Sequence, residues 1–349
     1  MTEESTVVVV GAGIAGLLVA RVLGARGVPV VVVEKSRGLG GRLATKRVDA
    51  AVFDQGAQYF TARSPRFSAL VAEWRARGVI ECWQERDVVA RWTRSADRLI
   101  ARPSMNALGK MLAEGVAVRR EWQVRSVRRD DRAWVLTADG QPPLRAGRLV
   151  VTAPVPQALA LFDDGVLPPS LREELRSVRY APCLALLVTL RGASAVPAEG
   201  VALDGDPVRW IADNTKKGVA PGVPGAVTVH LGPAFSAEHY TSTAAELATH
   251  VLPAIEPWLG AEVADVQVHR WRFSEPTATH REASVWLADL AVGFAGDGFG
   301  GPRVEGAALS GLDLADRILG DGRDAPSNVG GYGASAPSSA ARGLWPSSS

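Results

Sequence analysis

Three glycines near the start of the chain have a spacing that can bind a diphosphate. Gly11, Gly13 and Gly16 form G-x-G-x-x-G between an apolar run and a helical pattern, and Glu34 ends the next apolar run. The first glycine allows a tight turn, the second lets backbone N–H groups approach the phosphates, and the third lets the helix pack on the strand. With the partial positive charge of the helix N-terminus, the pattern predicts a dinucleotide site.

The acid at position 34 indicates a ligand with free ribose hydroxyls. Its carboxylate would accept hydrogen bonds from those hydroxyls and would repel a 2′-phosphate. FAD and NAD both satisfy this condition, so the first motif leaves the choice between them open.

A second glycine pair favours FAD. "GGRLATKR" begins six residues after Glu34, where Gly40 and Gly41 allow another close backbone approach and Arg42 offers a forked donor to the same diphosphate. A dehydrogenase that binds only NAD does not need this second loop.

A third stretch, "GDGFGGPRVEGAALSG", lies at residues 296–311. Asp297 can hydrogen-bond ribityl hydroxyls, and a helix from Val304 would direct its positive end at the ligand. That dipole would stabilise the negative charge of a reduced isoalloxazine. The alternative is a surface turn before a helix whose small residues allow close packing. No cysteine occurs at residues 290–320, so FAD is expected to be held without a covalent bond.

The elements that must position these residues form an alternating pattern. A buried strand, a helix and a second buried strand are expected at 6–10, 14–26 and 29–34, which gives a βαβ unit. Helices are expected at 65–77, 104–114, 243–255 and 304–319, a strand-like segment at 81–93, antiparallel strands within 116–138, and further strands in "GRLVVTAPVPQ", "CLALLVTL", "AVTVHLG" and "VWLADLAVGF".

This order predicts an α/β fold with a Rossmann-like FAD-binding lobe of the GR2 type and an inserted α+β substrate lobe on a mixed or antiparallel sheet. The FAD-binding domain is expected to comprise 1–62, 103–157 and 285–320, and the substrate domain 63–102 and 158–284. Residues 321–349 are rich in Gly, Ser, Ala and Pro without periodicity, so a disordered tail is expected there, and Trp345 has no assigned role.

Composition excludes several other classes of protein. The 39 basic and 37 acidic side chains nearly cancel and form no like-charged block, which argues against a nucleic-acid partner. Cys82 and Cys183 lie far apart in no metal or redox spacing. The polar start of the chain lacks a secretory leader, and no apolar stretch is long enough to span a membrane, so a cytoplasmic protein is expected.

Five stretches resemble bacterial renalase-type proteins, a branch of the flavin-containing amine oxidase superfamily. They are "FDQGAQYFTAR" at 53–63, "VTAPVPQ" at 151–157, "WIADNTKKG" at 210–218, "HRWRFSEP" at 269–276 and "AGDGFGGPRVEGAALSG" at 295–311. The resemblance covers residues 6–320 and implies FAD contacts by Ala15, Arg42, Ala57 and Gln58, with Gln58 close to the isoalloxazine edge.

The full set of candidate FAD-binding residues follows from the motifs together with this resemblance. It comprises Gly11, Gly13, Ile14, Ala15, Gly16, Glu34, Lys35, Gly40, Gly41, Arg42, Ala57, Gln58, Gly296, Asp297, Val304 and Glu305.

The resemblance also implies a reaction. Renalase-like enzymes oxidise 2- and 6-dihydroNAD(P) to β-NAD(P)+, and their flavin passes the electrons to O2 as H2O2. Loss of hydride from a dihydropyridine gives an aromatic cation directly, so no general base, and hence no catalytic side chain, is required. Candidates for a flat substrate pocket are Gln58, Tyr59, Phe60, Trp210, Trp271 and Phe294, although core packing would also explain the aromatic ones.

The remaining ionisable residues receive no catalytic role. The five histidines, His230, His239, His250, His269 and His280, are scattered without metal spacing, and no metal site is expected. Some superfamily amine oxidases hold a lysine near flavin N5 through water, but Lys216 and Lys217 are expected to be solvated loop residues.

Two alternatives stay open. One is an amine oxidase or desaturase of a small secondary metabolite, suggested by the shared motifs and by "TKKG", which departs from the Ser-Lys-Pro-Gly expected of the branch. The other is a non-catalytic binding protein without flavin, against which the intact glycine motifs argue. The expected partners are a dihydronicotinamide dinucleotide and O2, and the sequence leaves the oligomeric state undetermined.

Overall fold

A mainly parallel sheet joins strands from both ends of the chain. The computed structural model describes residues 6–83, 97–131, 133–203 and 205–321. The strands of this sheet run in the order β17 (Val285–Leu287), β18 (Val292–Phe294), β11 (Arg148–Val151), β1 (Val7–Val10), β2 (Val30–Val33) and β7 (Ala117–Arg119). Only the edge strand β17 pairs in the antiparallel sense. The runs of valine in β1 and β2 are typical of strands that are buried on both faces.

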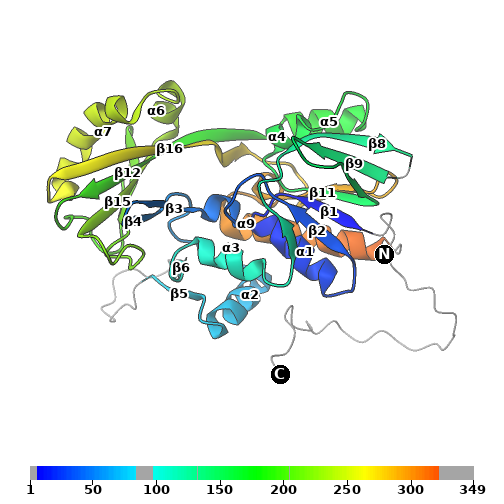
Figure 1. Cartoon of the computed structure of the whole chain (residues 1–349), viewed down its shortest axis with the longest axis horizontal. Helices are drawn as coiled ribbons and strands as arrows, with labels where there is room; N and C mark the ends of the chain where they lie inside the picture. The colour runs from blue at the N-terminus through cyan, green and yellow to red at the C-terminus, as the bar shows by residue number, and fades with distance from the viewer. Residues whose placement is uncertain (1–5, 84–96, 132, 204, 322–349) are drawn as a thin grey trace.

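Helices and a small sheet cover the two faces of the parallel sheet. One core lies under α1 (Ile14–Gly24), α2 (Pro65–Ala76), α3 (Asn106–Leu112) and α9 (Arg303–Gly320). The other lies under a three-stranded sheet and two short helices, β10 (Leu144–Ala146), β9 (Ala133–Ala138), β8 (Val124–Asp130), α4 (Val155–Leu159) and α5 (Pro169–Arg176). Figure 1 shows α1 and α9 side by side below the parallel sheet and β8 and β9 above it.

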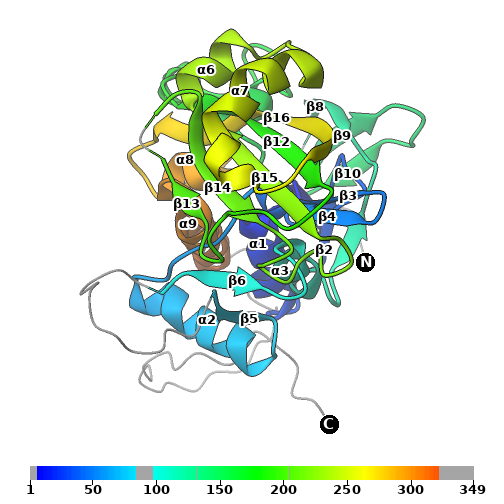
Figure 2. The same cartoon turned by 90° about the vertical axis from the view of Figure 1, so that its left-hand side faces the viewer.

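A five-stranded antiparallel sheet forms the other large layer. Its order is β13 (Val201–Ala202), β14 (Val208–Asp213), β15 (Gly225–Leu231), β12 (Arg179–Leu190) and β16 (Val263–Ala278). Leu186 lies opposite Val229 and Val268, and such residues form a core under α7 (Ala244–Leu259). The helices α6 (Pro233–Glu238) and α7 cover one face of this sheet, as Figure 2 shows, and β16 extends toward the parallel sheet in Figure 1.

Two two-stranded sheets and a short 3-10 helix complete the described fold. The hairpin β3 (Thr45–Val48) and β4 (Ala51–Asp54) packs on the open face of the antiparallel sheet, where Phe53 contacts the cluster that contains Leu187. The second hairpin pairs β5 (Ile80–Cys82) with β6 (Leu99–Ala101), and the 3-10 helix η2 spans Gly41–Leu43.

The predicted α/β fold with a mixed or antiparallel second sheet is confirmed, and several expected elements differ in detail. β7 pairs parallel with β2, although residues 116–138 were expected to be antiparallel throughout. "VWLADLAVGF" forms two strands, because the chain turns at Ala291 with a positive φ of 53°. α3 spans Asn106–Leu112 rather than 104–114, and α7 ends at Leu259 rather than at 255.

Some expectations are not tested by the described residues. Of the strand-like segment at 81–93, residues 84–93 lie outside them, and so do residues 322–349 of the expected tail, Trp345 included. The domain boundaries stay a prediction. Within the described ranges no helix is both long and apolar enough to cross a membrane.

Candidate cofactor and active site

The first glycine loop connects β1 to α1 and presents bare backbone. Gly11 has a φ of +107°, which favours glycine, and a Cβ on Gly16 would lie 2.1 Å from the Gly11 carbonyl oxygen. Gly13 is the N-cap of α1, and no side chain caps this helix. A Cβ on Gly13 would meet nothing within 4 Å. The uncapped helix start and the open space beside Gly13 fit a bound diphosphate.

The carboxylate of Glu34 is fixed beside this loop. Its Oε2 accepts from the N–H of Ala12 at 2.8 Å, and its Oε1 accepts from the N–H and Oγ of Ser36 at 2.9 and 2.7 Å. Because a carboxylate has about four acceptor positions, one remains for a ribose hydroxyl. The neighbouring candidate Lys35 is exposed.

The second glycine loop lies directly against the first. The N–H of Gly40 donates to the Ala12 carbonyl at 2.8 Å, and Gly13 and Gly40 form an isolated β-bridge. Gly41 approaches so closely that a Cβ there would lie 3.3 Å from the Cα of Gly13. The structure therefore brings the two predicted diphosphate loops together.

Arg42 joins this loop to the C-terminal motif. Its Nη1 and Nη2 each lie 2.6 Å from one carboxylate oxygen of Asp297, and Nη1 also donates to the carbonyls of Phe273 and Ser274. The hydroxyl of Tyr180 donates to Asp297 at 3.4 Å, and burial raises the pKa of that phenol. The two residues expected to contact different parts of FAD thus form a bidentate ion pair with each other.

The C-terminal motif forms α8 (Asp297–Gly300) and the start of α9. The N–H of Gly296 donates to Ser310 Oγ at 2.8 Å, and the N-cap of α9, Pro302, has no side-chain cap. Of the other candidates here, Val304 is buried in the core. Glu305 accepts hydrogen bonds from the N–H of Ser64 at 2.7 Å and of Arg63, so its carboxylate braces α9 against the start of α2.

The loop of residues 54–58 packs on the second glycine loop. The N–H of Ala57 donates to the Arg42 carbonyl at 2.9 Å, and a Cβ on Gly56 would lie 2.0 Å from that oxygen. Gln58 is 5% exposed, and its Nε2 donates to the carbonyls of Asp54 and Gly56. Its Oε1 is buried without a hydrogen-bond partner among the described residues, so a ligand could supply the missing donor.

The expectation of a solvated loop is wrong for Lys217. Its side chain is fully buried, and Nζ donates to Asp54 at 2.8 Å and to the Gln58 carbonyl at 2.6 Å. Burial lowers the pKa of Lys217 and the charge of Asp54 opposes this. Lys216 does lie at the surface, with its ammonium on the carbonyls of Ser194 and Val196.

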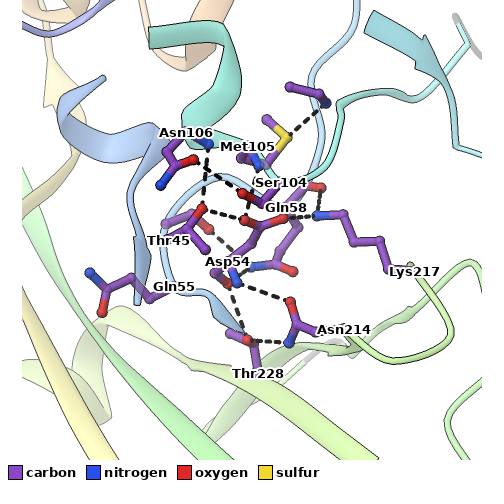
Figure 3. Close-up of polar contacts among 12 residues, drawn as sticks. Thr45, Asp54, Gln55, Gln58, Ser104, Met105, Asn106, Asn214, Lys217 and Thr228 are labelled. Atoms are coloured by element: carbon purple, nitrogen blue, oxygen red, sulfur yellow. Dashed lines mark hydrogen bonds and ion pairs between the residues drawn. The ribbon is translucent and has the colours of Figure 1, made fainter. Parts of the chain in front are cut away.

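Sequence reasoning also missed Asp54 and the two residues that bond its backbone, Asn214 and Thr228, all of which Figure 3 shows. The sequence held a partial signal in "FDQGAQ", where Asp54 directly follows an apolar run, and in "ADNTKKG", where Lys217 lies shortly beyond one. A buried charge needs a partner, and each motif contains one half of the pair.

The aromatic candidates divide into two groups. Tyr59 packs on Trp210 and Trp83 with ring centroids 5.4 and 5.9 Å apart, and Trp271 donates from Nε1 to the Gln55 carbonyl at 2.9 Å, so these rings border the 54–58 loop. Phe60 and Phe294 lie in the core. Phe60 contacts Phe67 and Phe294 contacts Phe162, and packing explains the positions of both.

Two histidines lie close to the same loop. His230 shares a hydrogen bond of 3.2 Å with the Gln55 carbonyl, and burial lowers its pKa to about 4. Burial also lowers the pKa of His269 to about 4, and its ring lies 4.3 Å from that of Trp271. Both are therefore neutral near pH 7. The described residues contain no group of three His, Cys, Asp or Glu side chains that could hold a metal ion.

Two family models match the chain. An NAD(P)-binding Rossmann-like domain matches residues 9–74, and a flavin-containing amine oxidoreductase model matches residues 87–319. The second match covers well over half of the chain. Together with the two glycine loops, it identifies FAD as the cofactor.

Individual proteins resemble the chain over different lengths. Putrescine oxidase of Kocuria rosea is 46% identical over 70 residues, which is 20% of this chain and 15% of that protein. Hydroxyneurosporene desaturase of Rubrivivax gelatinosus is 51% identical over 57 residues, 16% of this chain and 11% of that protein. The chain thus matches only a small part of each of these two proteins.

Solved structures share the fold of this chain over nearly its whole length. Cyclohexylamine oxidase of Brevibacterium oxydans IH-35A superposes with a TM-score of 0.70 at 14% identity, covering 91% of this chain and 99% of that one. At this identity the likeness concerns the fold and leaves the substrate open.

Proposed function

Because the chain belongs to the flavin-containing amine oxidoreductase family, we propose that this FAD-dependent oxidoreductase oxidises 2- and 6-dihydroNAD(P) to β-NAD(P)+. The resemblance of "FDQGAQYFTAR" and "WIADNTKKG" to renalase-type proteins supports this substrate. We also propose the division of labour derived from the sequence, with FAD on the parallel-sheet domain and the substrate on the inserted one.

The pairing of the charged groups around the 54–58 loop carries the proposal. Asp54 is paired with Lys217, Asp297 is paired with Arg42, and His230 is neutral and bonded to a carbonyl. A dihydropyridine loses hydride to become an aromatic cation, so its oxidation needs no base. These paired carboxylates also offer no counter-ion to a protonated amine, which favours an uncharged ring as substrate.

The residues of the chain would bind FAD and the substrate and orient them toward each other. Bound FAD supplies the redox chemistry, accepting a hydride and returning the electrons to O2 as H2O2. The glycine loops and the N-terminus of α1 would hold its diphosphate, and Glu34 its adenosine ribose. Tyr59, Trp210 and Trp271 would hold a nicotinamide ring flat, about 3 to 3.5 Å from the accepting atom.

Anaerobic mixing tests the substrate. Addition of 6-dihydroNAD to the yellow protein should bleach the visible flavin absorbance in a single turnover, and admission of O2 should restore it with one H2O2 per substrate. Ordinary NADH, reduced at the usual ring carbon, is the matched control and should bleach the flavin more slowly. Absence of bleaching with both the 2- and the 6-isomer would rule out this substrate.

The second candidate is oxidation or desaturation of a small amine or other metabolite. The local matches to putrescine oxidase and hydroxyneurosporene desaturase, together with the divergent "TKKG", favour it. Peroxide release that depends on added amine and is absent with every dihydronicotinamide isomer would select this function instead.

A further inference from the structure

A buried ion pair links the hairpin β3–β4 to the antiparallel sheet, and it has no role in the proposed reaction. The side chains of Asp54 and Lys217 are both 0% exposed, with Nζ 2.8 Å from Oδ2. Burying two charges is unfavourable unless good geometry and further hydrogen bonds compensate. The pair is therefore a candidate for a specific role.

The further hydrogen bonds are present. The second carboxylate oxygen of Asp54 accepts from Thr45 Oγ1 at 2.7 Å and from the N–H of Met105 at 3.0 Å. The ammonium of Lys217 also donates to the Gln58 carbonyl at 2.6 Å. Lys217 thus bridges the first and the last residue of the 54–58 loop.

The backbone of Asp54 is held from the antiparallel sheet as well. Its N–H donates to Asn214 Oδ1 at 3.0 Å, and its carbonyl accepts from Thr228 Oγ1 at 3.1 Å and from Gln58 Nε2. Figure 3 shows these side chains converging on the loop. Because Gln58 Nε2 donates to two carbonyl oxygens, the orientation of this amide is fixed, and its oxygen must point away from them.

That oxygen, Gln58 Oε1, is buried and has no partner among the described residues. A buried acceptor without a donor is unfavourable unless a ligand supplies one. The loop touches the carbonyl of Arg42, directly beside the two glycine loops that fit FAD. The isoalloxazine of FAD carries one imide N–H, at N3, which requires such an acceptor.

We propose that Asp54 and Lys217 are positioning residues that hold the Gln58 amide oxygen in place to accept a hydrogen bond from the N3–H of the FAD isoalloxazine. The inference rests on FAD occupying the site described above, and it is independent of the substrate. It gives the buried pair a role in cofactor recognition instead of in proton transfer.

A cofactor analogue isolates this hydrogen bond. Apoprotein is titrated with FAD and with N3-methyl-FAD, which lacks the donor, and dissociation constants are measured from flavin fluorescence without substrate. The wild type should bind FAD about tenfold more tightly than the methyl analogue. Gln58→Leu should remove this preference, and Lys216→Met, which changes the adjacent surface lysine, should keep it.

The pair is tested with the neutral double variant Asp54→Asn/Lys217→Met, which leaves no isolated buried charge. It should reduce the preference for FAD over the analogue to within about twofold, because the amide oxygen is no longer held. A merely structural role would weaken both cofactors equally and leave their ratio unchanged. That result would overturn the proposal, as would equal binding of the two cofactors by the wild type or a preference that survives in Gln58→Leu.

A milder variant covers the case in which the double variant does not fold. Thr45→Val removes one hydrogen bond to Asp54 and leaves both charges in place. It should lower the preference about two- to threefold with the far-UV spectrum unchanged. A full preference in Thr45→Val would count against positioning by Asp54. Since no substrate is present, none of these results depends on the proposed oxidation.

Discussion

Around the glycine loops, some residues matter because of the space that they leave free, and others because of their hydrogen bonds. Gly11 and Gly16 are required by their own neighbours, because an added Cβ would lie 2.7 Å from Thr152 Oγ1 and 2.1 Å from the Gly11 carbonyl. Gly13 differs, since nothing in the protein occupies the position of its missing Cβ. Gly11 and Gly16 therefore serve the fold, and the open space beside Gly13 fits a ligand.

Gly13→Val should therefore separate ligand binding from folding. The side chain would fill the space that a diphosphate needs, so FAD content after purification should fall below roughly a tenth of the wild-type value. The ratio of visible to ultraviolet absorbance measures this, and thermal unfolding of the apoprotein should be nearly unchanged. Gly24→Val is the matched control, because an added Cβ there also meets nothing within 4 Å. Full FAD content in Gly13→Val would contradict the site.

Glu34→Ala should weaken FAD binding by about 1.5 to 3 kcal/mol if the ribose hydrogen bonds are charge-assisted. The apoprotein should also lose stability, since the N–H groups of Ala12 and Ser36 lose their acceptor. Isothermal titration with FAD and urea unfolding of the apoprotein measure the two effects. Glu34→Gln keeps an acceptor oxygen and should show a smaller loss in both. An unchanged FAD affinity in the alanine variant would remove Glu34 from the site.

At the scale of elements, the approach of α9 to α1 brings the C-terminal motif to the glycine loops. A Cβ on Gly311 would lie 2.5 Å from the Ala15 carbonyl, so the two helices are in backbone contact. Close contact of this kind depends on small residues, and the stretch "VEGAALSG" supplies them. Their role as packing residues and the role of the motif in FAD binding are thus compatible.

Gly311→Leu should force the two helices apart. We expect a loss of about 1 to 3 kcal/mol in the free energy of unfolding, together with weaker FAD binding, because Asp297 moves with α9. Urea unfolding and FAD titration on the same preparation measure the two effects. Gly320→Ala, at the end of the same helix with no neighbour within 4 Å, should be neutral or slightly stabilising. Wild-type affinity and stability in Gly311→Leu would contradict the proposed coupling.

At the scale of the whole molecule, the cofactor site is assembled from distant parts of the chain. The ion pair between Arg42 and Asp297 spans 255 positions, and that between Asp54 and Lys217 spans 163. A ligand that contacts such a site binds only the folded chain, and its binding energy adds to stability.

FAD should therefore stabilise the entire described fold. At a free concentration about 100 times its dissociation constant, the gain should be about 2.7 kcal/mol in the free energy of unfolding. Urea unfolding followed by far-UV circular dichroism, with and without FAD, measures it. Adenosine monophosphate, which lacks the flavin, should give a smaller gain. Equal unfolding curves with and without FAD would indicate that the site does not bind the cofactor.

The sequence by itself determined the parts whose signals are local. The glycine spacing, the valine runs of β1 and β2, and the small residues of α9 are each patterns within one short stretch of the chain, and they predicted the Rossmann-like fold and FAD. Tertiary structure alone decided the partners of Arg42, Glu305 and Lys217, because each pairs with residues more than a hundred positions away. Such pairing depends on how the sheets pack, and periodicity within one element carries no information about it.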